Sequence, residues 1–123
     1  MTLREIKAMV MFQTNNDADD LGDFMPFLLD YINEGYDMLL EAKDHSHISA
    51  DIALKADTDV PELPVWTHRA LSDWATWMVY RNGNPQKQNR GYQFRAAFYG
   101  VMGQLREMRA DGGRVTRFQN IPE

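Results

Sequence analysis

The sequence predicts an all-α fold: a small bundle of about four helices, with an extended loop at 44–60 and an extended C-terminal tail. Four stretches carry apolar residues at helical spacings of three and four, and capping or stop signals stand at their ends. At 123 residues the chain is long enough to form a single core. We therefore expect one helical domain over 1–113, which includes the loop, and a C-terminal arm over 114–123.

The first helix is expected over residues 3–13. Thr2 and Glu5 match a capping box, in which the side chain of each residue bonds the backbone N–H of the other. The acidic stretch 15–23 then breaks the helix, because Asn and Asp side chains form local turns with the backbone. The apolar stripe of this helix consists of Leu3, Ile6 and Val10, with Met9 and Phe12 on a neighbouring ridge.

The second helix is expected over 26–42. Pro26 suits its first turn, where the missing N–H has no intrahelical partner. Gly35 lies in the middle of this helix and costs about 1 kcal/mol relative to Ala. A close crossing with another helix is the simplest reason for this glycine. The apolar stripe consists of Leu28, Leu29, Ile32, Tyr36, Leu39 and Leu40.

Residues 44–60 show a different pattern. From Ile48 to Ala56, apolar and polar residues nearly alternate, which is typical of an extended segment. An isolated strand is only marginally stable, so this segment would need a partner such as another subunit. Ile48, Ile52 and Leu54 would then contact that partner rather than build the core. An irregular loop packed on the helices explains the same pattern, and the sequence leaves this alternative open.

Two more helices are expected, over 64–82 and 85–110. Asn84 and Pro85 separate them, as the N-cap and the first residue of the last helix. The run 111–113 (DGG) ends that helix, and the tail beyond it lacks a helical period. The core stripes consist of Leu71, Trp74, Ala75 and Met78 in one helix, and Phe94, Phe98, Val101, Met102, Leu105 and Met108 in the other.

The charged residues are unevenly distributed. Residues 81–117 hold eight cationic and two acidic side chains, a local charge of +6, whereas residues 1–80 hold five and fifteen, a charge of −10. If these parts lie on opposite flanks, one copy attracts another head to tail. The alternative, that the basic helix neutralises the acidic helices within one monomer, stays open on charge alone. The candidate interface residues are Arg95, Arg106, Arg109, Arg114, Arg117, Phe118, Ile121, Ile48, Ile52 and Leu54.

The sequence offers no anchor for catalysis, a cofactor or a metal, and we expect no enzyme. It contains no cysteine and no phosphate-loop, serine-hydrolase or zinc-protease motif. His45 and His47 lack a third strong metal ligand, so a solvated loop is favoured. For His68 we favour a capping or interface role. The acidic run from Asp17 resembles a calcium loop, but Leu28 stands where the bidentate Glu is required.

Two stretches, 12–42 and 60–105, resemble a known family over roughly 75 of the 123 residues. The second stretch begins with P-E-L-P and an aromatic residue, and then places His68 and Asp73 on one helix. An N-G-N-P break and a helix with repeated Arg, Ala and aromatic residues follow. This pattern is similar to the head-to-tail connector proteins of tailed bacteriophages, the small helical adaptors beneath the portal.

The resemblance implies a helical, non-enzymatic structural protein of the virion, made in the bacterial host cytoplasm. Such adaptors form a homo-oligomeric ring, commonly a dodecamer, between the portal protein and the next connector, stopper or tail protein. DNA passes through the ring without sequence-specific binding, and no membrane is involved. The family has no catalytic residues to transfer. The long segment 44–60 departs from the family pattern, which leaves its partner open.

Two functions of other classes remain as alternatives. A helical nucleic-acid-binding regulator would use the basic helix 85–110 for recognition, although the N-G-N-P turn suits a helix hairpin better and the acidic remainder opposes DNA binding. A small metal-dependent enzyme would need a bound metal. The chain start lacks the apolar run of a signal peptide, and no stretch approaches the roughly 20 apolar residues of a membrane span. We therefore expect a soluble, cytoplasmically made protein.

Overall fold

The computed structural model describes residues 1–14 and 24–110, and all regular structure within these ranges is helical. The predicted all-α fold is therefore confirmed, and each of the four predicted helices is present. The stretch 15–23 and the arm 114–123 lie outside the described residues. The α-helices are α1 (Leu3–Gln13), α3 (Leu28–Asp44), α4 (His68–Tyr80) and α5 (Pro85–Ala110), and the short 3-10 helices η1 (Met25–Phe27) and η2 (Val65–Thr67) precede α3 and α4.

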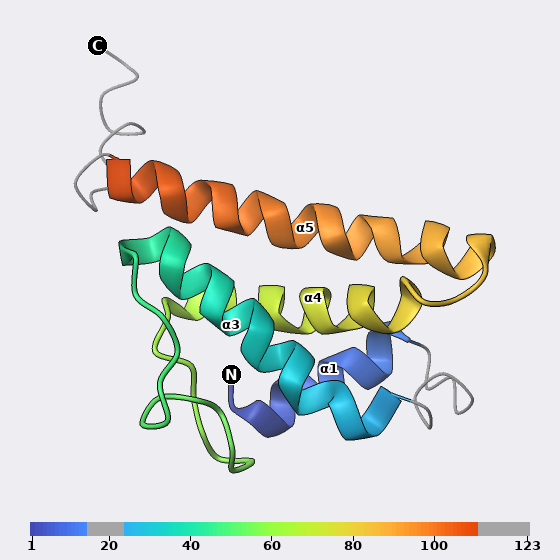
Figure 1. The fold of residues 1–123 in the computed structure, drawn as a ribbon, viewed down its shortest axis with the longest axis horizontal. Coiled ribbons are helices and arrows are strands. Elements are labelled where there is room, and N and C mark those ends of the chain that lie inside the picture. The colour runs from blue at the N-terminus through green and yellow to red at the C-terminus, as the bar shows by residue number, and fades with distance from the viewer. Residues whose placement is uncertain (15–23, 111–123) are drawn as a thin grey trace.

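The helix α4 is the centre of the bundle. It contacts α1, α3 and α5, and eleven of its thirteen residues are buried. In Figure 1, α5 lies along one side of α4, α1 lies on the other side, and α3 crosses in front. A helix buried nearly all round must bond its polar groups internally. The hydroxyl of Ser72 accordingly donates to the carbonyl oxygen of Arg69 at 2.7 Å.

The helix starts form as the sequence predicts. The hydroxyl of Thr2 accepts from the N–H of Glu5 at 3.2 Å, and the Glu5 carboxylate accepts from the N–H of Thr2 at 2.8 Å. The side chain of Asn84 accepts from the N–H of Lys87 at 3.0 Å and so caps α5. These bonds satisfy donors in the first turn that have no intrahelical acceptor.

Two glycines mark close helix crossings. A Cβ built on Gly35 would lie 3.2 Å from the Cβ of Trp74, so α3 and α4 approach closely at the predicted point. Gly91 plays the same role between α4 and α5, which sequence reasoning missed. A Cβ there would lie 2.7 Å from Cε3 of Trp77 and 2.9 Å from the Cβ of Tyr80. Both crossings bring a tryptophan of α4 against a bare helix backbone.

Gly91→Ala is expected to lower thermal stability, although Ala is the better helix former by about 1 kcal/mol. The added methyl group would force α4 and α5 apart. Gly100→Ala in the same helix is the matched control, because apart from its chain neighbours and the nearby backbone of α5, no atom of the described residues lies within 4 Å of its added Cβ. This control is expected to raise stability. Thermal unfolding followed by circular dichroism compares the two, and an equal gain at both positions would contradict the tight crossing.

The segment between α3 and α4 is an irregular loop fixed by side chains of α3. The amide nitrogen of Asn33 donates to the carbonyl oxygen of Leu54, and its amide oxygen accepts from the N–H of Leu54, both at 3.0 Å. The carboxylate of Asp37 accepts from the N–H of Ile48 at 2.7 Å, and the hydroxyl of Tyr36 accepts from the N–H of Glu62 at 2.8 Å. The loop is therefore anchored at three points along one helix.

The alternative that 44–60 contains an irregular loop packed on the helices is confirmed, and the expectation that its apolar residues stay outside the core is corrected. No strand forms in this part of the described chain, and Leu54 is only 1% exposed and belongs to the core. Ile48 and Ile52 are half-buried against the same core. The physical reason is Asn33, whose amide pairs with one residue of the loop as a neighbouring strand would.

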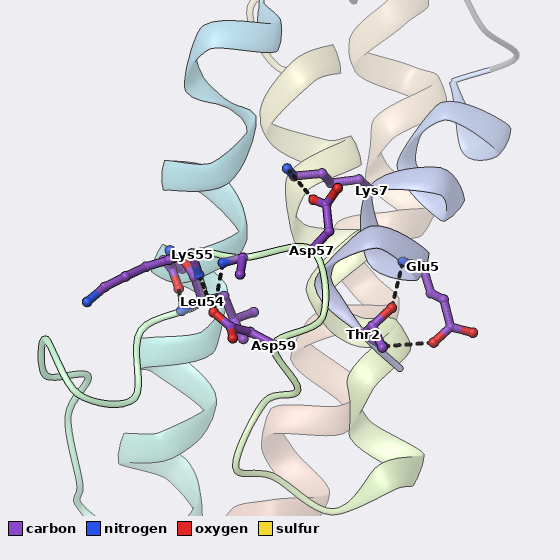
Figure 2. A network of polar contacts seen from close by, with 9 residues as sticks. Thr2, Glu5, Lys7, Leu54, Lys55, Asp57 and Asp59 are labelled. Carbon is purple, nitrogen blue, oxygen red and sulfur yellow. Dashed lines mark hydrogen bonds and ion pairs between the residues drawn. The ribbon is translucent and has the colours of Figure 1, made fainter.

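The loop also completes the start of α1. The N–H of Leu3 donates to the carbonyl oxygen of Asp59 at 2.8 Å, and the N–H of Arg4 donates to that of Asp57 at 3.0 Å. Lys7 reaches the Asp57 carboxylate at 3.3 Å, as Figure 2 shows. The carbonyl groups of Asp57 and Asp59 thus accept hydrogen bonds from N–H groups in the first turn of α1 that the capping box leaves without an acceptor.

Candidate interaction surfaces

Some of the cationic side chains of the basic helix α5 make contacts within the subunit itself. The guanidinium of Arg95 lies 4.9 Å from the ring centroid of Trp77 and 4.8 Å from that of Tyr92. These two rings stack with centroids 5.4 Å apart. A cation over aromatic faces is attracted by their quadrupoles, so this predicted interface residue helps to fasten α5 to α4.

Arg109 fastens the other end of α5 to α3. Its Nη1 donates to the carbonyl oxygen of Glu41 at 2.9 Å and lies 3.9 Å from the carboxylate oxygen Oε2 of the same residue. It also lies 3.5 Å from Nδ1 of His45. A cation is favourable here because the C-terminal end of α3 carries partial negative charge from the helix dipole.

Arg106 is exposed beside a groove of about 250 Å³ between α3 and α5. No ion pair joins Arg106 to another residue in the described part of the chain. Within the groove, Oε2 of Glu41 is buried and accepts no hydrogen bond from the described residues. The lining consists of Asp37, Met38, Glu41, His47, Met102 and Arg106.

The ten predicted interface residues do not form one surface. Arg95 lies about midway along α5, and Arg106 and Arg109 lie near its C-terminal end. Leu54 lies in the core, and Ile48 and Ile52 lie against it. The remaining candidates, Arg114, Arg117, Phe118 and Ile121, lie outside the described residues.

A second hollow, of about 410 Å³, lies on the loop between α3 and α4. Three of its lining residues are carboxylates and none is a cation. Two backbone N–H groups, of Ala56 and Lys55, donate to Asp59 at 2.8 Å each, and these bonds lower the pKa of Asp59 (Figure 2). We call this surface the acidic hollow; it is lined by Asp51, Ile52, Ala53, Asp59, Val60 and Glu62.

The exposed histidines do not form a metal centre. His45 ends α3 with a φ of 63°, a left-handed conformation. Nδ1 of His47 lies 3.3 Å from the Asp37 carboxylate. No group of three or more His, Asp or Glu side chains in the described ranges is placed to hold a metal ion. The acidic run that begins at Asp17 lies outside those ranges.

His68 is buried, with 1% of its surface exposed, and its ring contacts two other segments of the chain. Its Nδ1 lies 2.7 Å from the Met1 nitrogen, and its Nε2 lies 2.8 Å from the carbonyl oxygen of Leu63. Because the Met1 nitrogen donates to Nδ1, the ring proton resides on Nε2 and bonds Leu63. Burial lowers the pKa of His68. The expected capping or interface role gives way to an internal one that joins α1, the loop and α4.

Asp73 is a second buried titratable group, with 8% of its surface exposed. Its carboxylate accepts from Nε2 of Gln13 at 2.7 Å, and the Gln13 amide oxygen accepts from the hydroxyl of Thr76 at 2.6 Å. Burial raises the pKa of Asp73. Sequence reasoning missed this network, which joins the end of α1 to α4. Neither Asp73 nor His68 lines either hollow.

No family model, no curated protein and no solved structure matches this chain. Among the described residues, every helix is too short or too polar to cross a membrane.

Proposed function

We propose that the chain is a structural adaptor of a phage head–tail connector. It forms a ring beneath the portal protein and joins the DNA-filled head to the tail through the next connector or tail protein. In this role the protein belongs to the virion, performs no catalysis and needs no cofactor. The resemblance over 12–42 and 60–105 supports this assignment.

The position of the charges carries the proposal. Arg81 and Arg90 are exposed where α4 turns into α5. The loop 45–63 holds four acidic residues and one lysine, and Figure 1 places it toward the other end of the long axis. Charges this far apart do not neutralise each other across one subunit, because salt screens exposed charges beyond about 10 Å. They suit contact between unlike surfaces of successive copies, which is how a ring is built.

The arrangement of α4 and α5 weighs against the nucleic-acid-binding alternative. The two helices pack along each other and run antiparallel (Figure 1). A helix-turn-helix instead sets its recognition helix at roughly 90–120° to the preceding helix. The basic helix is thus held as one arm of a hairpin, with Phe98 and Leu105 buried against the bundle.

Co-expression with the portal protein of the same genome tests the function. We expect the full chain to co-purify with the portal and to appear in electron micrographs as a closed ring beneath it. Removal of 114–123 is expected to abolish this stable joining. A chain that never binds the portal contradicts the proposal. Salt-dependent binding to duplex DNA in place of portal binding would establish the regulator instead.

A further inference from the structure

The acidic hollow has the properties of a docking surface for a basic partner. Asp51 and Glu62 are exposed, and neither side chain bonds another described residue. Val60 is 52% exposed and adds an apolar contact at the same place. Lys55 makes no ion pair with these carboxylates; its Nζ donates to the carbonyl oxygen of Ala50 at 2.6 Å. Three carboxylates without an ion-pair partner among the described residues therefore give the hollow a net negative charge.

The surface is also held in a fixed shape. Two backbone N–H groups bond Asp59, and the bonds from α3 to Leu54 and Glu62 anchor the loop on either side of it. A pre-formed surface loses little conformational entropy when a partner binds. The loop thus presents its carboxylates at defined positions rather than as a solvated run of charge.

The complementary surface is the opposite end of the same molecule. The sequence contains no acidic residue between Asp73 and Glu107, and Arg81 and Arg90 project from the α4–α5 hairpin in this interval. We call these two arginines the basic end. Neither takes part in an ion pair with another described residue. The guanidinium groups match carboxylates in charge and in hydrogen-bond geometry.

We propose that the acidic hollow of one copy binds the basic end of a second copy. This inference rests on the proposed function and names the surfaces through which the ring closes. Figure 1 places the loop and the α4–α5 turn at opposite ends of the long axis, so the two surfaces of one subunit do not reach each other. Each copy therefore offers one surface of each kind, and association is head to tail.

Charge exchange between copies tests the pairing. One variant carries Asp51→Lys with Glu62→Lys, and the other carries Arg81→Glu with Arg90→Glu. Sedimentation velocity at low ionic strength measures self-association of the wild-type chain, of each variant and of their equimolar mixture. We expect the wild-type chain to associate and each variant alone to lose about tenfold or more in affinity. The mixture should regain it, because every contact then pairs unlike charges.

The control variant is Asp30→Lys with Asp44→Lys, which makes the same change in net charge outside both surfaces. It should associate like the wild-type chain, and circular dichroism should show every variant folded. The proposal is overturned if the wild-type chain does not self-associate, if the control loses as much affinity as the hollow variant, or if the mixture is not rescued. Portal binding is measured separately, so these failures leave the adaptor function to its own test.

Discussion

Asn33→Ala is expected to lower the free energy of unfolding by roughly 2–3 kcal/mol. The substitution removes the two hydrogen bonds, each 3.0 Å long, that hold the backbone N–H and carbonyl of Leu54. Because Leu54 is buried, both groups would be left without partners or would pull the side chain out of the core. Urea denaturation gives the change in stability, and hydrogen exchange at Leu54 reports on the bond itself.

Two further variants show whether the loss of stability comes from the hydrogen bonds of Asn33. Asn89→Ala on the exposed surface of α5 is the control, and its effect should stay within about 0.5 kcal/mol. Asn33→Asp keeps an acceptor for the Leu54 N–H but turns a carboxylate toward the Leu54 carbonyl, so it should not restore stability. Continued slow exchange of the Leu54 amide in Asn33→Ala would mean that the loop is anchored by other contacts.

Acidification below about pH 6.5, the ordinary pKa of histidine, is expected to destabilise the protein through His68. Burial lowers the pKa of His68 in the folded state, so the unfolded chain takes up a proton first. Stability contributed by the neutral ring is therefore lost as pH falls from 6.5 toward the lowered pKa. The loss approaches about 1.4 kcal/mol per pH unit, since one extra proton is bound on unfolding. Protonation also removes the acceptor that Nδ1 offers to the Met1 nitrogen.

Denaturation at a series of pH values measures this dependence. His68→Gln should flatten the profile below pH 6.5, because the group whose pKa is lowered by burial is then absent. Asp73 acts in the opposite direction at lower pH: its raised pKa means that the folded state binds a proton before the unfolded chain does. An unchanged slope in His68→Gln would show that another group titrates in this window.

Local signals explain why the helices could be predicted. The starts of α1 and α5 follow from Thr2 with Glu5 and from Asn84 with Pro85, whose effects act within one turn. The close crossing at Gly35 could be predicted, because a glycine inside an apolar helix has few explanations other than close contact with another helix. Gly91 lies in a polar stretch of α5, so its crossing with Trp77 becomes evident only when α4 is in place.

The interaction surfaces were harder to predict from the sequence, because they depend on contacts between residues that are far apart in the chain. The near-alternation around Leu54 indicated a strand, yet its bonding partner is a side chain, Asn33, in a helix. The charge of α5 predicted contacts with a partner. It gave no indication that Arg95 lies over aromatic rings or that Arg109 contacts the end of α3. Composition alone likewise gave no reason to expect Asp73 in the interior.

The bonds between the start of α1 and residues 57–59 bear on the order of events during synthesis. An isolated helix shorter than roughly 12–15 residues is marginal in water, and α1 has 11. Its backbone acceptors at Asp57 and Asp59, and the helix α4 on which it packs, leave the ribosome more than forty residues after its end. The entropic cost of closing so long a loop must be met before these contacts can stabilise α1. The helix α1 is therefore translated before its partners and is among the last of the described helices that can become stable.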